Sequence, residues 1–288
     1  ESGLVPARRQ ATVMDLLGMT AGLCYPGDDP AGQAAAALFA ENDARVLRGE
    51  GMSTLELCNR MGQLPLAFHP GEHFRYSTCA DVLGAVVEVA GKKPFARFLE
   101  EEIFQPLGMK DTAFWVPAEK RGRFAQAYTQ PGALRPYRQT HLEVGDYDRE
   151  PVFASGGAGL VSTLDDYAAF ATMLLAEGRY PGGQLFQPET VRFLTSPQLG
   201  PQPLADVWNS LDGCSYGKLM RVMRDPGRYP GLSRMDEYGW DGWLGTYFAN
   251  FPHEQMTMLM MTQRTDHGTG PLTRKLRNLL LSSPEARL

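Results

Sequence analysis

The chain has few of the features that mark metal, redox or disulfide-rich proteins. Its four cysteines, Cys24, Cys58, Cys79 and Cys214, are scattered and form no C-x-x-C pair. The five histidines are dispersed and form no H-E-x-x-H motif. We therefore expect buried, reduced thiols, no metal site and no bound cofactor.

Long apolar runs and clusters of basic residues are also missing. Runs such as residues 256–261 fall far short of the roughly 20 residues that a membrane span needs. The 28 Lys and Arg residues are outnumbered by 33 Asp and Glu residues, for a formal charge of -5, which argues against a nucleic-acid partner. With 43% hydrophobic residues, the composition is that of a soluble globular protein. The first nine residues lack the apolar core of a signal peptide, so we expect a cytoplasmic location.

Several nucleotide and hydrolase motifs are absent as well. The glycine cluster at residues 155–159 is not followed by Gly-Lys-Ser/Thr and does not have dinucleotide-binding spacing. Close packing of the backbone is therefore the favoured interpretation of this cluster. No G-x-S-x-G elbow is present, which disfavours an α/β-hydrolase.

The predicted secondary structure changes in character near the middle of the chain. Residues 1–153 are predicted to be mainly helical, with N-caps at Thr12, Asp29 and Ser53. Residues 154–288 are predicted to form a helix capped by Thr163, an antiparallel sheet and a final helix from about Pro271. Strands are expected at residues 215–222, 238–241, 245–251 and 256–262. This order indicates an α+β fold.

One tyrosine stands where a polar turn meets a helix. The turn at residues 69–72 leads to Tyr76, and apolar positions recur at helical spacing from Thr78 towards Gly91, the expected C′ residue. A second helix is expected from Phe95 to about residue 104, ending before a proline. A tyrosine acts as a general base only where positive charge favours its phenolate, because its reference pKa is about 10. Arg75 could supply that charge, although an exposed arginine is the safer default, and most buried tyrosines are structural.

The blocks around Tyr76 form a wider pattern. They are Pro70-Gly71-Glu72-x-Phe74-x-Tyr76-Ser77, Asp81-Val82-Leu83-Gly84, and a block at residues 98–112, with further blocks at residues 12–23, 157–167 and 238–246. Together they resemble the serine hydrolases related to class C β-lactamases and penicillin-binding proteins, over nearly the whole chain. The resemblance implies a β-lactamase/transpeptidase-like fold, with an antiparallel sheet flanked by helices and an inserted, mainly helical region.

The same resemblance implies roles for individual residues and favours the family's esterase branch. Tyr76 would share proton handling with the lysine of a Ser-x-x-Lys nucleophile, and the backbone N–H of Trp243 would stabilise the oxyanion. Trp240 would form a wall of the pocket. The other substrate-binding candidates are Ser77, Asp241 and Gly242.

The nucleophile itself is not where the family has it. The one Ser-x-x-Lys match, Ser215 to Lys218, lies in an expected strand, where positions three apart face opposite sides. We therefore expect the serine in a missing N-terminal segment, together with the first strands of the sheet. The expected function is acyl transfer from small carboxylic esters. The alternatives are a D-alanyl peptidase or weak β-lactamase acting on amides, and a catalytically silent binding module; the oligomeric state is left open.

Overall fold

The computed structural model describes residues 3–129, 135–136, 147–265, 267–268 and 270–283. The helices of the first half are α1 (Val13–Leu17), α2 (Pro30–Val46), α3 (Thr54–Met61), α4 (Cys79–Gly91), α5 (Phe95–Leu99) and α6 (Gln105–Leu107), with a π-helical turn η1 (Glu100–Phe104) and a 3-10 turn η2 (Ala118–Arg123). Those of the second half are α7 (Leu164–Leu175), α8 (Pro188–Leu194), α9 (Pro201–Ala205) and α10 (Pro271–Ser282), with a 3-10 turn η4 (Asn209–Leu211).

The main sheet has the order β5-β6-β7-β8-β9, and all its neighbours are antiparallel. The strands are β5 (Cys214–Tyr216), β6 (Arg221–Met223), β7 (Tyr238–Asp241), β8 (Tyr247–Phe251) and β9 (Met256–Met260). Two further antiparallel pairs join β1 (Tyr128–Thr129) to β2 (Arg135–Pro136) and β3 (Arg179–Tyr180) to β4 (Gly183–Gln184).

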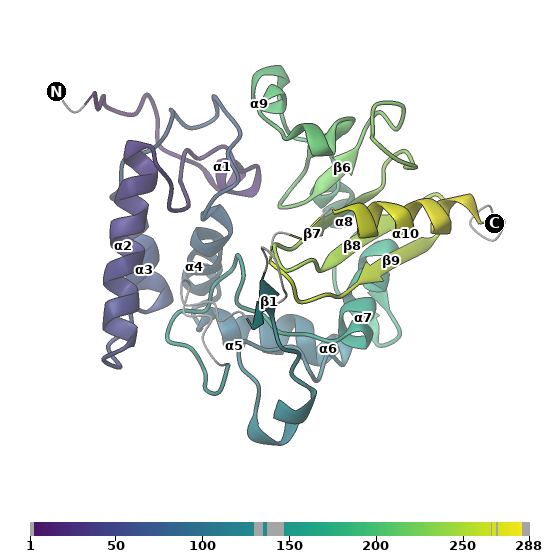
Figure 1. The fold of residues 1–288 in the computed structure, drawn as a ribbon, viewed down its shortest axis with the longest axis horizontal. Helices are drawn as coiled ribbons and strands as arrows, with labels where there is room; N and C mark the ends of the chain where they lie inside the picture. Colours follow the sequence, from purple (N-terminus) through teal and green to yellow (C-terminus); the bar gives the residue numbers. More distant parts are fainter. Residues whose placement is uncertain (1–2, 130–134, 137–146, 266, 269, 284–288) are drawn as a thin grey trace.

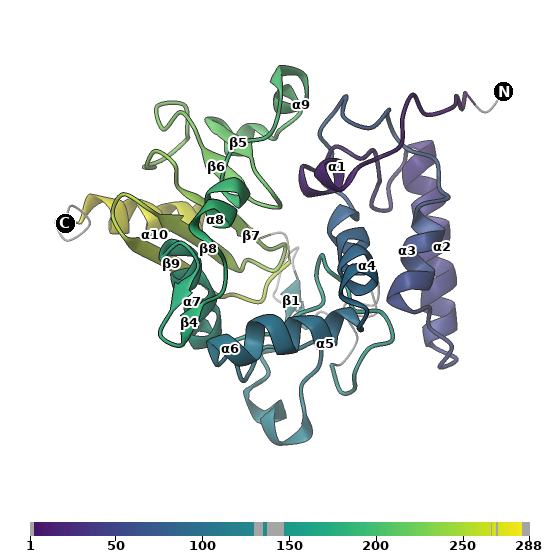
Figure 2. The ribbon, with the colours of Figure 1, turned by 180° about the vertical axis from the view of Figure 1, so that it is seen from behind.

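These elements lie in two neighbouring parts. Helices α1 to α4 form one part, the main sheet with α7, α8 and α10 forms the other, and α5 and α6 run between them (Figure 1). The reverse view places α7 and α8 on the sheet face opposite α10 (Figure 2). The division of the chain between residues 153 and 154 stays a prediction.

The caps read from the sequence are confirmed where helices begin. In each case the side chain accepts a hydrogen bond from a backbone N–H of the first turn: Thr12 from Asp15, Asp29 from Gly32, Ser53 from Glu56 and Thr163 from Asp166. Such bonds satisfy N–H groups that have no partner within the helix.

Helix ends follow the predictions less closely. Gly91 was expected to follow α4, but it is the last helical residue and Lys92 takes the left-handed conformation with φ 52°. A Cβ at Gly91 would lie 2.8 Å from the Phe98 ring, so this glycine permits close packing. The helix from Phe95 does not stop before Pro106, because the wide turn η1 places the proline at the start of α6, where its missing N–H is tolerated.

The strand predicted at residues 215–222 is wrong, because it is a hairpin of two strands. The chain reverses between β5 and β6, where Gly217 N–H donates to Met220 O at 2.8 Å. Leu219 adopts φ 61° in this turn. This left-handed conformation is uncommon for leucine, so the sequence does not predict it.

Alternate residues of β8 reach opposite layers of the core. Tyr247 and Phe251 pack with Leu281 of α10, whereas Phe248 packs with the cluster around Leu174 of α7. Period-two alternation of this kind is what a sheet covered on both faces requires. All four cysteines are free and buried, as expected. Among the residues that the structure describes, no helix combines the length and apolar character needed to cross a bilayer.

Candidate active site

Tyr76 stands at the end of a loop that leads into α4. Backbone hydrogen bonds hold this loop against the chain that follows α1: Gly71 N–H donates to Thr20 O at 2.8 Å, and Arg75 N–H donates to Met19 O at 2.9 Å. Gly71 has φ +92°, a conformation that glycine adopts without strain. The fold therefore fixes the chain immediately before Tyr76.

The phenol of Tyr76 meets Trp240 of β7. Trp240 Nε1–H donates a hydrogen bond of 3.3 Å to the Tyr76 hydroxyl, and the two ring centroids lie 5.3 Å apart. Burial raises the pKa of Tyr76, the bond from Trp240 lowers it, and the carboxylates of Asp81 and Asp241 raise it. The net effect is a raised pKa, which favours the neutral phenol at neutral pH.

Two neighbours of Tyr76 make contacts elsewhere. Arg75, considered as a charge partner for the phenolate, forms an ion pair with Asp29 at 2.5 Å. The hydroxyl of Ser77 lies 3.2 Å from Cys79 Sγ and is buried. Ser77 thus contacts the first turn of α4, and it is not among the residues that line the cavity described below.

The hairpin between β7 and β8 carries the other predicted residues. Gly242 N–H donates to Thr246 O at 2.7 Å, which closes the loop around Trp243. Asp241 is paired with the fully buried Arg221 at 3.2 Å. Arg221 belongs to β6 and also donates to Phe248 O of β8 at 3.1 Å, so it ties the end of β7 to both neighbouring strands.

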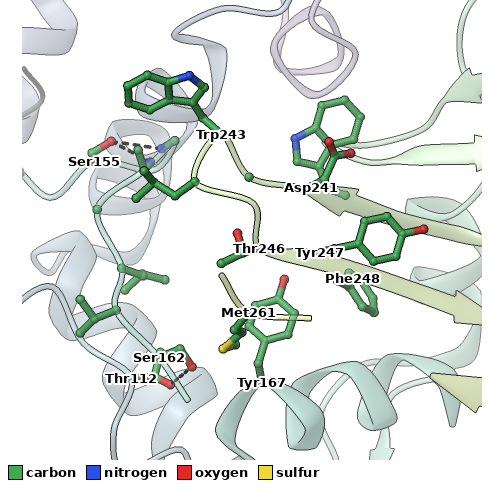
Figure 3. Close-up of a pocket in the computed structure, with 18 of the residues that line it drawn as sticks. Thr112, Ser155, Ser162, Tyr167, Asp241, Trp243, Thr246, Tyr247, Phe248 and Met261 are labelled. Atoms are coloured by element: carbon green, nitrogen blue, oxygen red, sulfur yellow. Dashed lines mark hydrogen bonds between the residues drawn. The ribbon is translucent and has the colours of Figure 1, made fainter. Parts of the chain in front are cut away.

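The glycine cluster faces this hairpin tip across the site. Figure 3 shows Ser155 opposite Trp243 and Thr246. Ser155 Oγ donates to Asp81 Oδ1 at 2.6 Å and accepts from Ala158 N–H at 3.1 Å. A Cβ at Gly156 would lie 2.2 Å from Ala80 O, so the cluster serves the close approach of this loop to α4.

A cavity of about 1500 Å³ lies among these elements. Of the predicted site residues, it is lined by Tyr76, Trp240, Asp241, Gly242 and Trp243. The structure adds aromatic residues that the sequence analysis did not identify, among them Tyr25, Tyr167, Phe170 and Trp208. Tyr167 ends the block at residues 157–167, although no role was expected for it, whereas the other three lie outside the blocks and nothing local in the sequence marks them.

The single strand that was expected to contain both residues of the Ser215–Lys218 match contains only Ser215. Ser215 is buried in β5, whereas Lys218 lies in the following turn and bonds Ser196 Oγ at 2.9 Å. The ammonium also lies 4.1 Å from the centre of the Phe193 ring. Within the described ranges, no group of three or more His, Cys, Asp and Glu residues could hold a metal ion.

Comparison with known proteins decides the family. Residues 3–281 match the family model described as Beta-lactamase. The chain belongs to the Beta-lactamase family. One relative is Protein Rv1367c of Mycobacterium tuberculosis (strain ATCC 25618 / H37Rv), which is 30% identical over 268 residues, covering 90% of this chain and 63% of the relative. This match confirms the resemblance read from the motifs.

Other members of the Beta-lactamase family carry functional names. Esterase EstB of Burkholderia gladioli is 32% identical over 238 residues, covering 77% of this chain and 58% of the esterase. A putative D-alanyl-D-alanine carboxypeptidase of Escherichia coli (strain K12) is 27% identical over 278 residues, covering 90% of this chain and 58% of the carboxypeptidase. The chain thus spans between 58% and 63% of the length of these three relatives.

Solved structures confirm the α+β, β-lactamase/transpeptidase-like fold. The structure described as "EstCE1, a hydrolase with promiscuous acyltransferase activity" superimposes with a TM-score of 0.76 at 22% identity, covering 93% of this chain and 71% of the other. At this identity the likeness establishes the fold of the Beta-lactamase family member described here, and its activity is a separate question.

Proposed function

We propose that this chain forms the larger part of a serine hydrolase that transfers acyl groups from small carboxylic esters to water. The observation that carries the proposal is the hydrogen bond between Trp240 Nε1 and the Tyr76 hydroxyl. It joins the tyrosine motif of the helical part to the Trp-x-Gly motif of the sheet at the wall of one large cavity. The name of the relative EstB, an esterase, supports the ester over the amide.

Each motif residue then has a chemical task. The serine oxygen attacks the ester carbonyl and gives its proton either to the neutral amine of the lysine or to the Tyr76 phenolate, which the positive charge of that lysine would stabilise. The backbone N–H of Trp243 stabilises the oxyanion, and collapse of the intermediate releases the alcohol with that proton. Water then hydrolyses the acyl-serine bond. Trp240, Asp241, Gly242 and Ser77 shape or support the substrate pocket.

The proposal assigns the nucleophilic serine and its lysine to a segment that precedes residue 1. Three observations support this assignment. Lys218 bonds Ser196 rather than Ser215, no lysine among the described residues lines the cavity, and the relatives are longer than this chain. The cavity would hold that segment as well as the substrate.

Amide substrates are the alternative on the same fold. The relative named a putative D-alanyl-D-alanine carboxypeptidase favours this reading, and a weak β-lactamase would use the same machinery. A catalytically silent binding module is the third candidate, and it requires that the complete gene encode no Ser-x-x-Lys.

The test uses the protein encoded by the complete gene. We expect it to hydrolyse p-nitrophenyl acetate faster than a chromogenic cephalosporin, and to be labelled on one serine by a fluorophosphonate probe. Faster turnover of the cephalosporin or of a D-alanyl dipeptide would replace the esterase assignment. The matched control is a protein of residues 1–288 whose mass of 31.8 kDa is verified; labelling of that chain would place the nucleophile within it.

A further inference from the structure

Trp208 is an exposed indole at the wall of the cavity. It lies between α9 and η4, lines the cavity and is 46% exposed. An apolar ring of this size, open on one side to a cavity, offers a stacking surface to whatever enters. None of the sequence motifs includes it.

The indole continues the aromatic wall that contains the proposed catalytic tyrosine. Its centroid lies 5.7 Å from that of Tyr76 and 6.3 Å from that of Trp240. Trp240 and Tyr76 are themselves 5.3 Å apart, so the three rings form one contiguous surface. Tyr76 and Trp240 are half-buried, whereas Trp208 is the exposed end of the row.

The position of Trp208 is fixed by contacts to the Tyr76 loop. Asp206 Oδ2 accepts a hydrogen bond of 3.1 Å from Phe74 N–H and lies 2.9 Å from His73 Nδ1. The Phe74 ring meets the indole edge-on at 5.8 Å. Because Phe74 is two residues before Tyr76, the segment that carries Trp208 is held in register with the tyrosine.

We propose that Trp208 is a specificity-determining residue that makes the site prefer aryl esters over aliphatic esters. This inference rests on the proposed function and names its substrate class. A planar ring placed beside Tyr76 stacks on the indole and gains the aromatic pairing that an alkyl group of similar volume does not. Asp206 holds the segment that carries Trp208, and the Phe74 ring packs against the indole, so stacking costs little ordering of the protein.

The test compares two acetates that differ in the alcohol. In the complete protein, Trp208→Ala lowers the ratio of kcat/KM for phenyl acetate to that for ethyl acetate by about 2- to 12-fold, the scale of one aromatic pair. Trp208→Phe retains most of the ratio. The matched control is Trp115→Ala, because Trp115 is also exposed, at 36%, and does not line the cavity; it leaves the ratio unchanged.

A binding measurement separates this inference from the proposed function. Acetanilide is expected to bind more tightly than N-cyclohexylacetamide by calorimetry, and Trp208→Ala abolishes the difference even if no ester is hydrolysed. If Trp208→Ala still hydrolyses both acetates with an unchanged ratio of kcat/KM for phenyl acetate to that for ethyl acetate, the role of Trp208 is refuted and the esterase assignment stays intact. A larger loss for acetylcholine than for phenyl acetate would replace aryl stacking with cation recognition.

Discussion

At the scale of single residues, Tyr76 is the group whose removal tests the chemistry most directly. In the complete protein, Tyr76→Phe is expected to preserve the fold, because the ring stays packed against Trp240, and to lower kcat for p-nitrophenyl acetate by roughly 10²- to 10⁴-fold. Steady-state kinetics and circular dichroism measure the two effects. Tyr180→Phe serves as the control, since Tyr180 does not line the cavity. Near-normal turnover in Tyr76→Phe would reduce the tyrosine to a packing residue.

Asp81 sets the charge around that tyrosine from the first turn of α4. The carboxyl is fully buried, Ser155 and Gly157 donate to its Oδ1, and its Oδ2 has no hydrogen-bond partner. Asp81 raises the pKa of Tyr76, and Asn can accept the same two bonds without the charge. We therefore expect Asp81→Asn to lower the pKa of Tyr76 and to move the acid limb of the kcat profile to lower pH.

The other charged group facing Tyr76 is Asp241 of β7, which remains paired with Arg221 in this variant. A loss of stability without a shift of the pH profile would show that Asp81 only fastens the glycine loop to α4. The profile is read with p-nitrophenyl acetate, and unfolding in urea gives the stability of the same samples.

Some site residues could be identified from the sequence and others could not. The difference is whether a residue stands in a local motif or reaches the site through contacts with residues far away in the sequence. Tyr76 and Trp240 stand in local motifs, so both could be assigned before the structure. Trp208 meets Tyr76 through tertiary contacts such as the bond between Asp206 and Phe74, which lie 132 positions apart, and no local pattern predicts such a contact. Asp81 stands in one of the motif blocks, but its place between the tyrosine and the glycine loop depends on tertiary packing.

At the scale of elements, starts of helices were predictable and turns were less so. Thr12, Asp29 and Thr163 cap helices by bonds within their own first turn, which is local chemistry. The β5–β6 reversal places Leu219 at φ 61°, and the N–H groups of Lys218 and Leu219 bond Leu194 O and Leu17 O, contacts distant in sequence that no local pattern predicts. Gly91 was misassigned because its role is contact with Phe98.

Asn250 provides an element-scale prediction, because it ties α7 to the sheet. Its buried amide donates to Ala171 O at 2.8 Å and to the Tyr238 hydroxyl at 3.0 Å. Asn250→Ala leaves buried groups without partners and is expected to lower the free energy of unfolding by about 1–3 kcal/mol. Urea denaturation measures the change against Asn209→Ala, whose side chain is exposed. Equal stabilities of the two variants would contradict a structural role for this amide.

At the scale of the whole molecule, the buried tyrosines predict a loss of stability in alkali. Burial raises the pKa of Tyr147, Tyr167, Tyr229 and Tyr238 to about 12, whereas the same groups titrate near about 10 when unfolded. The unfolded chain therefore releases protons first. Their contribution to stability is complete below about pH 10 and is lost as the pH rises towards about 12.

Urea denaturation at a series of pH values measures this loss, which approaches about 1.4 kcal/mol per pH unit for each tyrosine. Tyr229→Phe isolates the contribution of one phenol to this loss of stability. The Tyr229 hydroxyl is buried without a hydrogen-bond partner, and the ring keeps its contact with Arg277 at 5.1 Å. The variant is expected to be at least as stable as the parent near neutral pH and to lose stability less steeply in alkali. An identical alkaline slope in parent and variant would mean that this phenol ionises equally well in the folded and unfolded chains.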